Sequence, residues 1–194
     1  MKPTKGYEEA KTITDKEKLP KGGYVIEILD VEEIGKKGET NYLKFSFDIA
    51  EGEHKGFYEK DYNSQNTEDQ KWRGIYNLFI AKEDGSEMDN WTLTKFKTAI
   101  TSIENSNKGY HWDWEEKDLK GKIVGAVFVD KEWEMNGRTG FATACVGFRN
   151  VEAIRTGNFK QPDDIFLNGA SAGNKDEANT KDWADNDEGG NLPF

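Results

Sequence analysis

The sequence has a single cysteine, Cys145, and only two histidines among its 194 residues. One cysteine excludes a disulfide framework within the chain and every zinc-finger spacing, and it fits a protein of a reducing cytoplasm. No apolar run approaches the roughly 20 residues that span a bilayer. The first 23 residues contain lysines but no apolar segment typical of a secretion signal. The sequence therefore favours a protein that is neither secreted by a standard signal nor embedded in a membrane.

The motifs of common enzyme classes are also missing. There is no GxxxxGK[ST] phosphate loop, no GxSxG nucleophile elbow, no HExxH and no CxxC. His111 precedes Asp113 by two residues and Glu115 by four, but this spacing alone does not build a three-ligand metal site. Cys145 lies in an apolar run and is expected to be a small core side chain. We expect a non-enzymatic protein with no cofactor and no metal, and a metal-dependent nuclease is the weakest alternative.

Basic residues are fewer than acidic ones, 27 against 37, which gives a net charge of -10 at pH 7. Such a charge argues against nucleic-acid binding, because phosphate contacts need Lys and Arg. Residues 168–194, however, hold six acids and two lysines, so the preceding 167 residues have a net charge of -6 and 25 basic side chains. A basic face on the domain is compatible with this distribution, because the local potential matters more than the net charge.

Length and patterning favour one folded domain, residues 21–162, between a polar arm, residues 1–20, and a polar tail, residues 163–194. The tail is rich in Gly, Asn and Asp and poor in apolar residues, a composition that predicts disorder.

Alternating apolar residues predict five strands in the domain. Residues 24–31 are apolar on both parities, which predicts a strand covered on both faces, and residues 42–49 alternate most regularly. Residues 57–62, FYEKDY, are interpreted as the third strand. The last two strands flank Asn136 and Gly137, a strong two-residue hairpin signal. Glycines 125 and 147 within those runs suggest bulges or sharp bends.

Two helices are expected between the third and fourth strands. Thr67 and Gln70 fit a capping box, followed at helical spacing by a stripe of Trp72, Ile75, Tyr76 and Phe79. A second helix is expected from Asp89 or Asn90 to just before residues 105–109, with a stripe of Leu93, Phe96, Ile100 and Ile103. This order predicts a mainly β protein: a five-stranded OB-fold barrel with helices between strands 3 and 4, plus a disordered acidic C-terminal tail. A β-sandwich with inserted helices is the alternative.

On several predicted strands, aromatic and basic residues lie on the face opposite the apolar one. Single-stranded nucleic acid binds to such mixtures, because bases stack on rings and phosphates pair with cations. The same residues also stabilise sheets without any ligand. Trp72, on the predicted helix stripe, is expected in the core. The candidate DNA-binding residues are Tyr42, Lys44, Tyr58, Lys60, Tyr62, Arg73, Trp133, Arg138 and Arg149.

The last ten residues, DNDEGGNLPF, resemble the C-terminus of bacterial single-stranded DNA-binding proteins. The resemblance implies a peptide that docks into a basic-rimmed apolar pocket on replication, recombination and repair proteins. A terminal apolar ring, its carboxylate and nearby acids suit that docking. Here Gly189, Gly190 and Asn191 separate the acids from the tip. The candidate partner-binding residues are Asp185, Asp187, Glu188, Leu192, Pro193 and Phe194.

The domain is similar to single-stranded DNA-binding proteins encoded by tailed phages of Gram-positive hosts. The similarity lies in GGYVIEILDVEE, YLKFSFDIAEGEHKGFY and VGFRNVEAIRTGNFKQP, between about Gly22 and Pro162. It implies an OB-fold, no enzymatic activity, and a role in phage DNA replication and recombination in the cytoplasm of the bacterial host. The expected partners are single-stranded DNA and, through the tail, replication or recombination proteins, with homo-oligomerisation as one option. The alternative function is a protein-interaction module with a β-sandwich fold.

Overall fold

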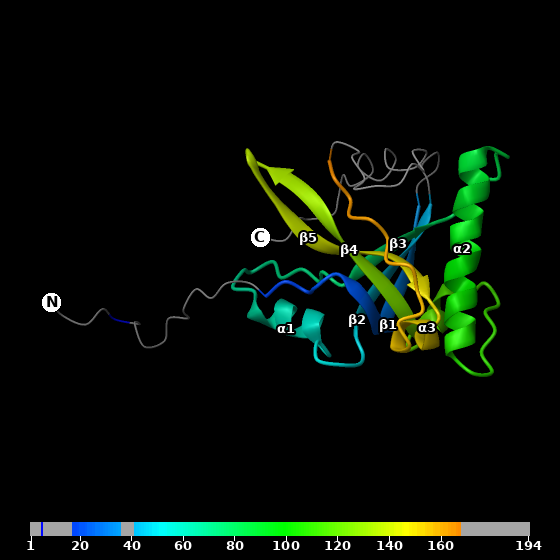
Figure 1. Ribbon diagram of the computed structural model, residues 1–194, viewed down its shortest axis with the longest axis horizontal. Coiled ribbons are helices and arrows are strands. Elements are labelled where there is room, and N and C mark those ends of the chain that lie inside the picture. Colours follow the sequence, from blue (N-terminus) through cyan, green and yellow to red (C-terminus); the bar gives the residue numbers. More distant parts are fainter. Residues whose placement is uncertain (1–4, 6–16, 36–40, 168–194) are drawn as a thin grey trace.

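The computed structural model of the chain describes residue 5 and residues 17–35 and 41–167. Most of the predicted arm and the tail from residue 168 onward lie outside these residues (Figure 1). The predicted disorder of the tail and its six candidate partner-binding residues therefore remain predictions.

The described chain forms five strands, three α-helices and one short 3-10 helix. In order they are β1 (Gly22–Ile34), β2 (Tyr42–Ile49), α1 (Phe57–Ser64), β3 (Ile75–Phe79), α2 (Glu87–Ser106), the 3-10 helix η1 (Glu116–Leu119), β4 (Ile123–Met135), β5 (Arg138–Arg149) and α3 (Val151–Arg155). The mainly β class and the number of strands are confirmed, and α2 lies between the third and fourth strands as expected.

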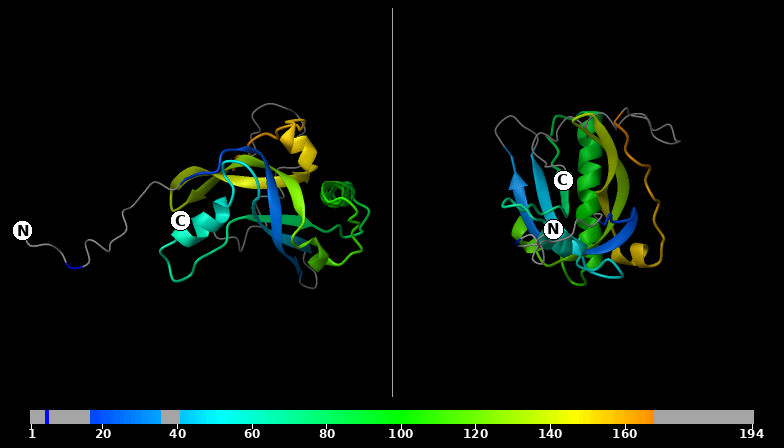
Figure 2. Two further views of the ribbon diagram at one scale, coloured as in Figure 1. Left: turned by 90° about the horizontal axis from the view of Figure 1, so that it is seen from below. Right: turned by 90° about the vertical axis from the view of Figure 1, so that its left-hand side faces the viewer.

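The strands form a single antiparallel sheet in the order β3-β2-β1-β4-β5. The sheet is strongly curved (Figure 2), and side chains of its two edge strands are in contact. The ring centroids of Tyr76 in β3 and Phe148 in β5 are 4.9 Å apart. Within the described residues no β3–β5 ladder closes the sheet. These residues also form no second sheet, so they do not build the two packed sheets of a sandwich.

The core lies inside the curve of the sheet and is rich in aromatic rings. Phe45, Phe47, Phe128 and Phe148 are at most 1% exposed. Phe47 and Phe128 meet edge to face, with ring centroids 5.9 Å apart. Contacts of this kind add about 0.5–1.5 kcal/mol per pair beyond the burial of their area. One side of α2 covers this core and packs against β3, β4 and β5.

The first strand is covered on both faces near its start, as its sequence predicts. Val25 and Ile26 are neighbours, yet both are buried. The outer cover is α3 and the segment after it, because a Cβ on Gly23 would lie 2.6 Å from Phe159 and one on Gly125 would lie 2.4 Å from Ile154. Gly125 therefore allows a helix to approach the sheet closely, rather than forming a bulge.

The prediction of a third strand at residues 57–62 was wrong, because these residues form helix α1. Gly56 precedes the helix and provides no side-chain cap. Instead the buried carboxylate of Asp48 at the end of β2 accepts hydrogen bonds from the backbone N–H groups of Tyr58 (2.9 Å) and Glu59 (3.0 Å). A carboxylate at a helix N-terminus satisfies unpaired donors and complements the helix dipole. A residue ten positions upstream thus fixes the helix.

The prediction of a helix from residue 67 was also wrong, since Ile75–Phe79 is strand β3. Tyr76 and Leu78 are buried, while Ile75, Asn77 and Phe79 lie on the other face of the strand. All five residues pair with β2. The predicted capping box does not form, because Thr67 bonds to the carbonyl of Asp69 and Gln70 bonds to those of Tyr62 and Gln65. In a run this short, helical and alternating spacing are hard to tell apart.

Other local predictions agree with the structure. Asn136 and Gly137 form the β4–β5 turn with positive φ of 51° and 72°, as a two-residue hairpin requires. The β4–β5 pairing shifts register where Gly147 lies, as expected of a bulge. Helix α2 begins at Glu87, slightly earlier than expected, with Ser86 as its cap. Leu93 is the exception, because it was predicted on the buried stripe of α2 and is 54% exposed.

Short segments on both sides of the predicted domain attach to β4. Ile165 pairs with Lys131 in parallel, and its N–H donates to the carbonyl of Asp130 at 2.9 Å. Lys21 and Asp164 form an ion pair at 2.6 Å. Leu19, within the predicted arm, is 2% exposed and belongs to the core. These contacts place the entry and exit of the described chain beside the hairpin.

Candidate nucleic-acid interface

The outer face of β2 and β3 carries two of the candidate residues. Tyr42 and Lys44 are half-buried and alternate with the buried residues of β2. Their partners across the ladder are Phe79 and Asn77. The ring centroids of Tyr42 and Phe79 are 5.7 Å apart. This face therefore combines two rings and a cation, which suits contact with an unpaired base and its phosphate.

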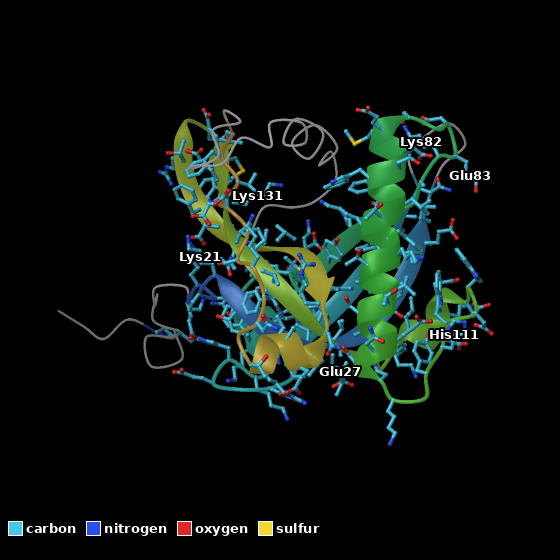
Figure 3. All side chains as sticks on the ribbon, turned by 45° about the vertical axis from the view of Figure 1, so that its right-hand side comes forward. Lys21, Glu27, Lys82, Glu83, His111 and Lys131 are labelled. Atoms are coloured by element: carbon cyan, nitrogen blue, oxygen red, sulfur yellow. The ribbon has the colours of Figure 1, made fainter. Side chains whose placement is uncertain are left out.

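The hairpin of β4 and β5 extends beyond the sheet as a two-stranded ribbon (Figure 3). Residues two apart on a strand share a face, so Lys131 and Trp133 lie on the same side of β4. The ring of Trp133 lies over Gly140 of β5, where a Cβ would be 2.6 Å away. Arg138 is exposed at the turn. Gly140 thus leaves room for the ring of Trp133 on the face of the ribbon that also carries Lys131.

The opposite face of the ribbon is apolar and acidic. Phe141, 45% exposed, contacts Phe166 edge to face at 5.8 Å. Its partner across the ladder is Glu132. Acids on this face make it a poor surface for phosphate, so the face that carries Trp133 is the better candidate.

Helix α1 and the segment before β3 hold four candidates. Tyr58, Lys60 and Tyr62 were expected to share one face of a strand, but they lie on a helix instead. Tyr58 is buried against Phe47, and this burial raises the pKa of its hydroxyl. Lys60 is exposed, and the ring of Tyr62 contacts Trp72 at 5.8 Å. Trp72, expected in the core, is partly buried against it. Because Tyr58 is 6% exposed, it cannot stack on a base in this arrangement.

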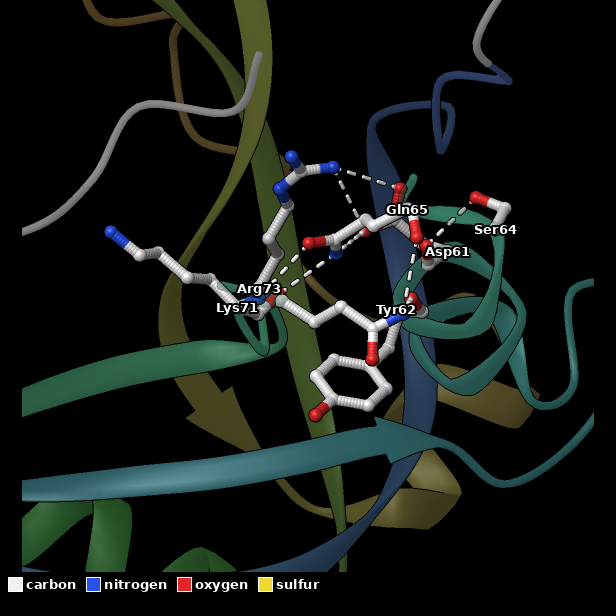
Figure 4. A network of polar contacts seen from close by, with 7 residues as sticks. Asp61, Tyr62, Ser64, Gln65, Lys71 and Arg73 are labelled. Atoms are coloured by element: carbon white, nitrogen blue, oxygen red, sulfur yellow. Dashed lines mark hydrogen bonds and ion pairs between the residues drawn. The ribbon is translucent and has the colours of Figure 1, made fainter. Parts of the chain in front are cut away.

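Arg73 is held in a polar network that joins α1 to the following segment (Figure 4). Its Nη1 lies 3.1 Å from both carboxylate oxygens of Asp61, and both side chains are largely buried. Gln65 accepts from the backbone N–H of Lys71 at 2.9 Å and donates to its carbonyl at 2.9 Å. An arginine paired in this way contributes first to holding the segment, so Arg73 is a weaker candidate for DNA contact than its sequence suggests.

Arg149 lies half-buried on β5, and its Nη1 donates to the carbonyl of Phe148 at 2.7 Å. Helix α2 brings Lys95 close to it, with the Lys95 ammonium 3.5 Å from the centroid of the Trp91 ring. Burial, and to a smaller extent the positive charge of Arg149, together lower the pKa of Lys95 to about 7. Sequence reasoning missed Trp91 and Lys95, although their spacing of four residues on a predicted helix was visible.

The loop after α2 presents an unusual aromatic pair. Trp114 is 78% exposed and has a φ of 75°, a strained conformation for a bulky residue. Its ring contacts that of Trp112 at 4.9 Å. His111, weighed as a metal ligand, instead places Nδ1 2.6 Å from the Glu104 carboxylate. Within the described chain no three His, Cys, Asp or Glu side chains are grouped so that they could hold a metal ion.

No model of a protein family matches the chain, and no curated protein matches it. Among the described helices, none has the length and apolar character needed to cross a membrane. The candidate interface therefore rests on the geometry above.

Proposed function

We propose that the chain is a non-enzymatic, sequence-independent single-stranded DNA-binding protein with an OB-like barrel. The strand order β3-β2-β1-β4-β5, the meeting of its edge strands and the position of α2 all support an OB-like fold. The observation that carries the function is the repeated placement of rings beside cations on the outer surface: Tyr42 with Lys44, Trp91 with Lys95, and Trp133 with Lys131.

These pairs offer what an unpaired strand needs and a duplex does not. A base in a duplex is stacked already, whereas an unpaired base gains about 1–3 kcal/mol from an aromatic platform. The resemblance to phage single-stranded DNA-binding proteins points to the same function, in phage DNA replication and recombination.

The test is a fluorescence titration, because six tryptophans report on stacking. We expect an oligo-dT strand of about 16 nucleotides to quench the emission, with affinity that falls as salt rises. A duplex of the same length should bind much more weakly. Unchanged emission at low salt, together with no binding by sedimentation, would sink the proposal.

We further propose that the tail recruits replication or recombination proteins and is not needed for DNA contact. Deletion of residues 185–194 should leave the affinity for oligo-dT unchanged or raise it, because the deletion removes three acids from a protein that binds an anion. The same deletion should abolish recruitment. A large loss of DNA affinity in the truncated protein would contradict this division of roles.

A protein-interaction module is the second candidate, and Trp114 favours it. Large rings this exposed often contact other proteins, and its neighbours Asp113 and Glu115 are exposed acids that would repel a phosphate backbone. The substitution Trp114→Ala should leave the affinity for oligo-dT unchanged under the first proposal. If the protein does not bind oligo-dT at all, the interaction module becomes the better account.

A further inference from the structure

One side of α2 faces away from the core and carries a ring and a cation in contact. Trp91 and Lys95 are four residues apart and therefore lie on the same side of the helix. The Lys95 ammonium is 3.5 Å from the Trp91 ring centroid, within the range of a cation–π interaction. Trp91 is 37% exposed, and Lys95 is half-buried. The helix thus holds a charged group at a partly desolvated surface beside an accessible aromatic residue.

A second cation reaches this place from the sheet. Helix α2 packs against β5, and Arg149 on β5 is close enough for its charge to disfavour the charged form of Lys95. The hydrogen bond from Nη1 of Arg149 to the Phe148 carbonyl fixes the guanidinium near the strand.

We propose that Trp91, Lys95 and Arg149 form a subsite for one nucleotide, in which Trp91 stacks on the base while Lys95 and Arg149 bind the neighbouring phosphate. This inference rests on the proposed function and assigns a specific place to it. An anion between two cations relieves their repulsion, and electrostatic attraction is stronger where water is partly excluded. A ring beside two cations matches a nucleotide better than it matches a free phosphate or a purely apolar ligand.

The subsite predicts different effects for three substitutions. Trp91→Ala should weaken oligo-dT binding about tenfold through the lost stacking, and Lys95→Gln should weaken it by a similar factor. Lys95→Gln should also reduce the slope of log affinity against log salt by about one unit, because one phosphate contact is lost. Lys95→Arg should retain the salt slope and most of the affinity, because the charge remains.

A matched control lies on the same helix. Lys97 is exposed and only two residues from Lys95, so it projects from another side of α2. Lys97→Gln removes the same charge and should change the affinity less than twofold. Trp91→Phe keeps a ring and should bind nearly as well as the unmodified protein, yet with less quenching.

The outcomes separate the subsite from the function. If the unmodified protein binds oligo-dT while Trp91→Ala and Lys95→Gln match it in affinity and salt slope, the subsite is wrong and the function stands. If the unmodified protein does not bind, both fail. A loss of affinity in Lys97→Gln equal to that in Lys95→Gln would show only a general charge effect and would overturn the subsite. Circular dichroism of each variant checks that the fold is retained.

Discussion

The affinity for single-stranded DNA should depend on pH through Lys95. In the free protein, burial and Arg149 lower the pKa of Lys95 to about 7. A phosphate bound at this residue favours the ammonium form, so binding above that pKa must first add a proton to Lys95. The sign follows directly: the affinity is highest below the pKa and falls as the pH rises through it.

The magnitude follows from the charged fraction of Lys95. About nine tenths of this side chain is charged at about pH 6, and about one tenth at about pH 8. Binding that requires the charged form should therefore weaken about tenfold between these values, close to 1.4 kcal/mol. Without DNA, stability should change with the opposite sign. The unfolded chain binds more protons above the lowered pKa, so the free energy of unfolding rises with pH between the folded and unfolded pKa values.

The assay is the oligo-dT titration repeated across this pH range at constant salt. Lys95→Arg stays charged throughout, so its profile should be flat, and the difference between the two profiles isolates Lys95 from the two histidines. The reasoning is refuted if the unmodified protein and Lys95→Arg show the same pH dependence.

Three further predictions concern the fold. Asp48→Ala removes the acceptor of three backbone N–H groups, those of Ile49, Tyr58 and Glu59. It should lower the free energy of unfolding, measured in urea, by about 2–4 kcal/mol. A change equal to that of a surface variant such as Asp69→Ala would disprove the cap. Gly74→Ala places a Cβ 2.2 Å from the Phe47 carbonyl oxygen and should cost about 1–3 kcal/mol in the same measurement, whereas an unchanged midpoint would rule out the close approach. Cys145 is partly buried, and this burial raises the pKa of its thiol to about 12, so a thiol reagent should label the native protein much more slowly than the unfolded chain. Equal labelling rates in the two states would contradict this prediction.

Local signals in the sequence predicted the elements whose structure is determined locally. The Asn136-Gly137 turn needs only two residues that tolerate positive φ, and β2 shows its alternation within eight residues. The identities of α1 and β3 depend on distant contacts instead. Asp48 caps α1 from the preceding strand, β2, and residues 75–79 form a strand because they pair with β2. No pattern within either segment contains that information.

The candidate interface was predicted only where strand parity was right. Tyr42 and Lys44 lie on the outer face of β2 as expected, while Tyr58 is buried because its segment is a helix. Arg73, in the segment before β3, pairs with Asp61 of α1, a contact that the sequence does not specify. The sequence does not single out Trp91 and Lys95, because a Trp and a Lys four residues apart are ordinary on a helix and only the packing of α2 against β5 brings Arg149 close to them.

The most direct test of the central claim is the titration of the full-length protein with oligo-dT, at low and high salt and beside a duplex of equal length. We expect quenching of tryptophan emission by the single strand, weaker binding at high salt, and much weaker binding of the duplex. Equal affinity for single strand and duplex, or no binding to either at low salt, would contradict the proposed function.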